Sequence, residues 1–215
     1  WIELGMVLAL NAIYMSVWRW SGARLTGLLA ATIAAFPFAL LAGAIATAIA
    51  IGAKWVLMGR FRPGEHPLFD GFVWRNELAD VFAESLAVPS IIRLSIGSEL
   101  FNTYARLMGT TIGRDVWCET WWLPEFDLVR LEDRVTINRG TVLQTHLFQD
   151  RVMTLSRTEM ETGACLGANS NMLPGARVGA RSVVGVGSLV LRDEYLPNDT
   201  YWSGNPVQFV NQEEA

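Results

Sequence analysis

The sequence predicts a mixed fold in which N-terminal transmembrane helices are followed by a parallel β-helix of hexapeptide repeats. Two observations predict it: a long stretch near the N-terminus without a charged residue, and an aliphatic residue at every sixth position after residue 111. Hydrophobic residues make up 51% of the 215 positions and charged residues only 18%. We therefore expect a transmembrane helical hairpin over 1–54, an amphipathic helical connector over 55–110 and the β-helix over 111–215.

Two uncharged runs predict the hairpin. Leu25–Ala53 is longer than the roughly 20 residues of helix that cross the apolar core of a bilayer, and Pro37 can kink it. The run Leu4–Trp18 is shorter and ends in Trp-Arg-Trp at 18–20, a pattern typical of a membrane interface. The alternative is a buried helical hairpin in a soluble protein.

The basic residues around these runs predict an orientation. Arg19 and Arg24 lie between the runs, whereas Lys54, Arg60 and Arg62 follow the second one. The larger group favours the cytoplasmic side, so we expect the chain after residue 54 on the cytoplasmic face of a bacterial plasma membrane. The first residue is a tryptophan, and we expect a fragment of a longer protein. The net charge of −4 and the lack of a basic stripe argue against nucleic acid as a partner.

The repeat of six runs without a break from position 160. A period of six is not helical, and it predicts short strands joined by tight turns and stacked into a coil. Each aliphatic residue that opens a unit then points inward, and the small fifth residue leaves room at a corner. The openers are Met160, Leu166, Met172, Val178, Val184 and Val190, and the small residues are Ala164, Ser170, Ala176, Ser182 and Ser188.

The same period is present earlier, with two changes of phase. Ile112 and Cys118 open the first units, and a second set of openers comprises Leu131, Ile137 and Leu143. The phase slips between 118 and 131, and again between 143 and 160, where we expect a loop to leave the coil. In the connector, 74–86 is helix-like and we expect Pro89 to end that helix; residues 99–113 predict a short helix stopped by Gly109.

His146 is the residue best suited to chemistry. It is the fourth residue of the unit that opens at Leu143, so strand alternation points it outward, beside the second phase slip. With an ordinary pKa near 6.5, an imidazole can act as a general base at neutral pH. A side-chain amide such as that of Gln144 can hold an oxyanion, and a carboxylate can orient the imidazole. The candidates for that carboxylate are Asp127, Asp133 and Asp150; the alternative is an idle surface histidine.

Other notable residues have ordinary explanations as well. Four arginines come from adjacent units: Arg114, Arg130, Arg134 and Arg139. They predict either a positive strip that binds the phosphate of phosphopantetheine, with Arg134 and Arg139 as the main candidates, or a solvated face. Cys118 and Cys165 lack the spacing of a metal site and are expected to pack in the core. We expect a structural role for His66 and a packing role for the tryptophans (Trp117, Trp121 and Trp122). Glu125 lies beside the first slip, where structure explains it as well as function does.

Three segments resemble a known family: GEHPLFDGFVWRNEL (64–78), LPEFDLVRLEDRVTINRGTVLQTHLFQDRVM (123–153) and GVGSLVLRDEYLPNDTYWSGNPV (185–207). They are similar to the C-terminal membrane region of amino-acid homopolymer synthetases that resemble nonribosomal peptide synthetases, the ε-poly-L-lysine synthetase type. The QTHLFQDRVM match at 144–153 is the specific part. The β-helix itself resembles the hexapeptide-repeat acyltransferases, which implies a left-handed coil with about 18 residues per turn.

The resemblance implies an activity and partners. Adenylation and thiolation domains upstream would load an amino acid onto a phosphopantetheine thioester, so no cofactor is bound directly. Tandem β-helix copies would then form amide bonds, with His146 as the base. Two alternatives remain open: a non-catalytic copy that completes a pseudo-trimer, and a membrane-bound acetyltransferase that uses coenzyme A.

Overall fold

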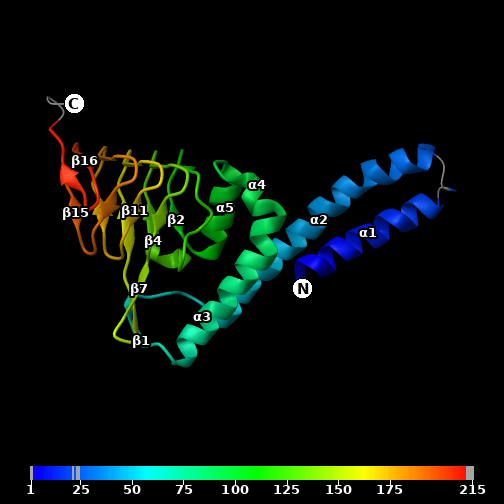
Figure 1. Ribbon diagram of the computed structural model, residues 1–215, viewed down its shortest axis with the longest axis horizontal. Helices are drawn as coiled ribbons and strands as arrows, with labels where there is room; N and C mark the ends of the chain where they lie inside the picture. The colour runs from blue at the N-terminus through cyan, green and yellow to red at the C-terminus, as the bar shows by residue number, and fades with distance from the viewer. Residues whose placement is uncertain (1, 21, 23–24, 212–215) are drawn as a thin grey trace.

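A computed structural model of the chain describes residues 2–20, 22 and 25–211, in which a helical part leads into a stacked β-structure (Figure 1). Helices α1 (Ile2–Trp20) and α2 (Leu25–Leu57) run side by side, and α2 continues through Pro37. Within the described residues, Leu29–Leu57 is the one helix long and apolar enough to cross a membrane. The second predicted span lies in α1 and stays a prediction.

The connector is helical, as expected, but its course differs at the proline. It comprises β1 (Gly64–Pro67), α3 (Gly71–Phe82), the π-helix η1 (Ala83–Ile92), α4 (Arg93–Ser95) and α5 (Glu99–Met108). The expectation that Pro89 ends the helix is wrong, because the path continues to Ser95. A proline ring clashes with the carbonyl four residues earlier in an α-helix, and the wider π winding moves that carbonyl away. Gly109 ends α5 as expected, with φ 123°.

Small residues allow η1 to pack closely on α2. Ala46 and Ala50 are buried, and a Cβ built on Gly43 would lie 2.6 Å from Cγ1 of Ile91. A glycine at position 43 is therefore required for this helix contact, which fixes the connector along the second half of α2.

The C-terminal part is a parallel β-helix, as the hexapeptide period predicts, and it has three faces. One face contains β2 (Thr111–Ile112), β4 (Val129–Leu131), β9 (Thr158–Met160), β12 (Arg177–Val178) and β15 (Tyr195–Leu196). The second contains β3 (Trp117–Cys118), β5 (Thr136–Ile137), β10 (Cys165–Leu166), β13 (Val183–Val184) and β16 (Tyr201–Ser203), with β17 (Gln208–Phe209) antiparallel at its end. The third contains β6 (Val142–Leu143), β11 (Asn171–Met172) and β14 (Leu189–Val190).

The interior of the coil is filled by the predicted openers. All six openers from Met160 to Val190 are fully buried, and so are Leu131, Ile137 and Leu143. Met160, Val178 and Leu196 are register partners on successive coils, which matches the expected turn of about 18 residues. The left-handed winding stays the expectation that the resemblance gives.

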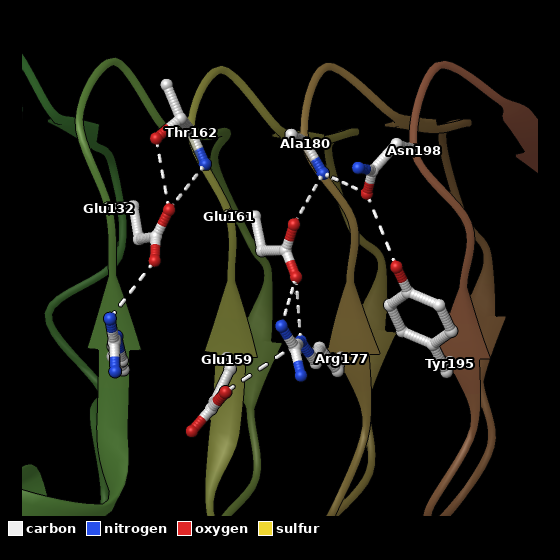
Figure 2. A network of polar contacts seen from close by, with 9 residues as sticks. Glu132, Glu159, Glu161, Thr162, Arg177, Ala180, Tyr195 and Asn198 are labelled. Carbon is white, nitrogen blue, oxygen red and sulfur yellow. Dashed lines mark hydrogen bonds and ion pairs between the residues drawn. The ribbon is translucent and has the colours of Figure 1, made fainter.

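Polar side chains join successive coils on an outer face, as Figure 2 shows. Glu132 accepts hydrogen bonds from the backbone N–H (3.1 Å) and hydroxyl (3.0 Å) of Thr162 on the next coil. Further along, the Asn198 side chain accepts from the backbone N–H of Ala180, at 2.9 Å. A single hydrogen bond of this kind typically contributes about 0.5–1.5 kcal/mol net, so these contacts add modestly to the stability of the stack.

Because the openers are fully buried, a charged side chain at one of their positions should disrupt the stacked coils. We expect Val178→Asp to abolish the cooperative unfolding transition of the β-helix, because an unpaired carboxylate cannot be solvated at a position with 0% exposure. Val186→Asp, at a position 71% exposed, is the matched control and should unfold like the wild type. Circular dichroism during heating measures both, and a normal transition for Val178→Asp would contradict the inward placement.

Candidate active site

The two phase slips of the sequence mark two excursions from the coil. Residues 119–128 occupy the place where the first coil would contribute a strand to the third face, and they end in a short 3₁₀ turn, η2 (Phe126–Leu128). The second excursion is an antiparallel hairpin of β7 (His146–Gln149) and β8 (Val152–Leu155), which also pairs with β1. The expected loop after Leu143 is therefore a hairpin that extends a small sheet toward the connector (Figure 1).

The hairpin brings His146 onto Glu125 of the first excursion. Nδ1 of His146 lies 2.9 Å from both carboxylate oxygens of Glu125. The side chain of Glu125 is fully buried, and that of His146 is 19% exposed. His146 thus belongs to the base of the hairpin and is mostly covered, which corrects the expectation of an outward imidazole on the coil wall.

The carboxylate of Glu125 is held from three sides. The side-chain amide of Asn76 on α3 donates to Oε1 at 3.0 Å, and the hydroxyl of Thr145 lies 2.5 Å from Oε2. The backbone of Glu125 has φ 37° and ψ 68°, a left-handed conformation that is unfavourable for a residue with a side chain. Surrounding contacts must stabilise that conformation, and strained backbone of this kind clusters at functional sites.

This arrangement leaves one imidazole nitrogen free. The hydrogen bond to Glu125 places the proton of the neutral imidazole on Nδ1, so Nε2 carries the lone pair. Within the described residues, Nε2 has no hydrogen-bond partner. The ring of Phe148 packs edge-on against the imidazole at 5.3 Å between centroids. A buried carboxylate, an oriented imidazole and a free Nε2 are the features that general-base chemistry requires.

Charges around the pair act on its protonation. Burial lowers the pKa of His146, but the hydrogen bond and charge of Glu125, with Asp80 and Glu77, outweigh burial and raise the pKa above 6.5. Asp80 on α3 is half-buried. Burial first, then the carboxylates of Glu125, Glu84 and Glu77, raise the pKa of Asp80 to about 7, although His146 opposes this rise.

The aspartates expected to orient His146 do not contact it. Oδ2 of Asp127 pairs with Nζ of buried Lys54 at 2.6 Å, which ties the end of α2 to the β-helix. Asp133 pairs with Arg114 at 2.8 Å. Asp150 is exposed in the hairpin turn, where both it and Arg151 have positive φ. The orienting carboxylate is Glu125, whose position follows from the stacking of two excursions.

The remaining predicted site residues are spread over the surface of the coil. Gln144 contributes its backbone: its carbonyl accepts the hydroxyl of Thr158 at 2.9 Å, and its N–H bonds to the next coil. Arg134 and Arg139 lie at different corners, before and after β5, so they do not converge. Arg139 lines a cavity of about 440 Å³ with Arg93 and Trp121. Arg114 and Arg130 are paired with acids.

A different group of arginines converges where the helices meet the coil. They line a cavity of about 390 Å³ together with Trp55 and Asp127 (Arg60, Arg62, Arg106 and Arg157). Sequence spacing could not group these residues, because they come from three segments far apart in the chain.

The other histidine and the cysteines have structural surroundings. His66 stacks on Phe72 with ring centroids 3.6 Å apart, as a structural role predicts. Cys118 is buried and Cys165 is half-buried, and both are free thiols. Across the part of the chain that the structure describes, no group of His, Cys, Asp or Glu side chains could hold a metal ion.

Comparison with curated proteins finds one similar sequence. The chain is 34% identical over 182 residues to a delta-poly-L-ornithine synthetase from Acinetobacter baumannii (strain AB307-0294), an alignment that covers 85% of the chain. The chain is related to the poly-amino-acid synthetases. It spans 13% of the length of that relative. No family model matches the chain.

Solved structures similar to this chain include acetyltransferases. One is a hexapeptide-repeat acetyltransferase from Vibrio cholerae, with 20% identity, a TM-score of 0.43 and coverage of 56% of this chain and 85% of that one. Another is soybean serine acetyltransferase, with 19% identity, a TM-score of 0.40 and coverage of 65% and 57%.

The titration of His146 tests the pair directly. In the chain labelled with ¹³C-histidine and held in detergent micelles, we expect the His146 resonance to titrate with a midpoint above 6.5, because the carboxylate stabilises the imidazolium. Glu125→Gln should lower the midpoint, since a neutral amide no longer attracts the proton. His66→Asn assigns the two signals. A midpoint unchanged by Glu125→Gln would show that the two side chains do not interact.

Proposed function

We propose that this chain is a membrane-anchored acyltransferase unit that forms amide bonds from a carrier-bound aminoacyl thioester in a nonribosomal amino-acid polymer synthetase. The observation that carries the proposal is the free Nε2 of His146, with Nδ1 held by buried Glu125. The name of the related synthetase supports a polymer of amino acids as the product.

The chemistry requires a base in this position. An amine attacks the thioester carbonyl through its lone pair, and a C–N bond forms while the nitrogen loses a proton to Nε2 of His146. The C–S bond then breaks, and the proton passes from Nε2 to the departing thiolate. Glu125 stabilises the imidazolium that exists between these two events. A general base of this kind typically contributes about 10²–10⁴-fold to the rate.

One cavity would receive the thioester on its phosphopantetheine arm. Arg93, Arg139 and Glu119 line this cavity beside Trp121, and its two guanidinium groups can bind a phosphate. Arg139 would contact the phosphate, whereas Arg134 does not line this cavity. The arm and its thioester would come from adenylation and thiolation domains ahead of this chain.

The membrane anchor is the least polar element of the chain. Large apolar side chains of α2 are exposed in the isolated chain, among them Ile33 at 74% and Phe36 at 69%. Lipid would cover them, and Lys54, Arg60 and Arg62 at the end of α2 favour a cytoplasmic β-helix. Homologous β-helix copies in the same synthetase would be the neighbours of this one.

Replacement of the base tests the function. In the full-length synthetase, we expect His146→Asn to reduce polymer formation by about 10²–10⁴-fold. Adenylation, measured as ATP–pyrophosphate exchange, should stay normal because it occurs in another domain. The matched control is His66→Asn, which should retain polymer formation. Full polymer yield from His146→Asn would instead identify this chain as a non-catalytic copy.

A further inference from the structure

A small cavity borders the segment that carries Glu125, because the residues on either side of Glu125 in the chain line it. Its volume of about 20 Å³ accommodates one group the size of a water molecule. Pro124, the residue before Glu125, forms part of its wall, and Asp80 and Glu84 line it as well. The aromatic residues of the wall are Tyr104, Trp121, Trp122 and Phe126.

The charge around this cavity is negative. Asp80 and Glu84 lie one turn apart on the helical path α3–η1, and Glu77 precedes them on the same path. Among the described residues that line the cavity, none is a lysine or an arginine. Burial first, and then these neighbouring carboxylates, raises the pKa of Asp80. A cation in the cavity would therefore be stabilised.

Tyr104 provides an independent indication of a ligand. The residue is 3% exposed, and its hydroxyl is buried without a hydrogen-bond partner in the described part of the chain. A buried hydroxyl that lacks a partner destabilises a fold by about 1–3 kcal/mol. Burial and the nearby Asp80 raise the pKa of Tyr104, so its hydroxyl stays neutral and its oxygen can accept a hydrogen bond. A donor placed in the cavity would satisfy it.

The aromatic walls suit a cation carried on an alkyl chain. The rings of Trp121 and Trp122 lie with centroids 6.5 Å apart and planes tilted by 31°. The face of an indole attracts an ammonium or guanidinium group within about 6 Å of its centroid, and its apolar surface packs against methylene groups. An ammonium fits the volume, whereas the planar guanidinium group is too large for a cavity of this size.

We propose that this cavity binds the ammonium group of a diamino substrate, namely the amine that does not react. Carboxylates around an amine keep it protonated, and a protonated amine has no lone pair with which to attack a thioester. The second amine of the same molecule would reach Nε2 of His146 and lose its proton there. The cavity would thus determine which of two amines forms the amide bond. This inference rests on the proposed function.

Binding of a diamine separates this inference from catalysis. The probe is radiolabelled 1,4-diaminobutane, added to the full-length protein that carries His146→Ala, so that no transfer can occur. We expect saturable binding that Asp80→Asn and Tyr104→Phe each weaken by about tenfold, the loss of one charge-assisted or buried hydrogen bond. Tyr104→Phe keeps the ring and thus the packing, which guards against misfolding of the other variant.

Matched controls decide the outcome. Asp115→Asn removes an exposed carboxylate from a distant turn and should leave the affinity unchanged. The neutral diol 1,4-butanediol should not displace the probe. Equal affinity in Asp80→Asn, or displacement by the diol, would overturn the assignment. If Asp80→Asn loses diamine binding while His146→Asn still makes polymer, the cavity stands and the proposed function fails.

Discussion

The structure depends on the closed interior of the coil, which accepts one aliphatic side chain per strand and little else. The openers from Leu131 to Val190 are fully buried, and the small residues at the corners are buried as well. Extra residues cannot be stored inside such a stack, so they must leave it. The His146–Glu125 pair lies on two such excursions.

The two excursions meet because they belong to successive coils. Residues 119–128 leave the first coil and the hairpin 146–155 leaves the second, which places Glu125 against His146. The helical connector closes the third side and contributes Asn76 and Asp80 from α3. The regular part of the coil thus positions a site that contains few of its own residues.

The hexapeptide repeat predicts the regular coil but not the contacts of the segments that leave it. Period six predicted the strands and the inward openers, and it marked both phase slips, whereas the turn length of about 18 residues came from the resemblance to hexapeptide-repeat acyltransferases. It could not identify Glu125 as the partner of His146, because that contact joins excursions whose paths no period describes. The expected positive strip placed Arg134 and Arg139 together because they come from adjacent units. Residues share a corner only when they are about one full turn apart, as Arg114 and Arg134 are, and a backbone hydrogen bond joins that pair.

The helical connector shows a second limit of local patterns. Pro89 is a strong helix terminator in an α-helix, and only the tertiary packing of η1 on α2 reveals that a π winding carries the chain past it. The pairing of β1 with the hairpin is likewise long-range, since Gly64 meets Leu155. The sequence alone offered no indication that these two segments pair with each other.

The most direct test of the central claim is a double-mutant cycle between Glu125 and His146. The free energy of unfolding would be measured by denaturant titration at pH 6, where the imidazole is charged, for the wild type, Glu125→Gln, His146→Ala and the double variant. A contact between the two side chains predicts a coupling of about 0.5–3 kcal/mol. Effects that add to within about 0.5 kcal/mol would show that the buried carboxylate and the imidazole do not form a pair.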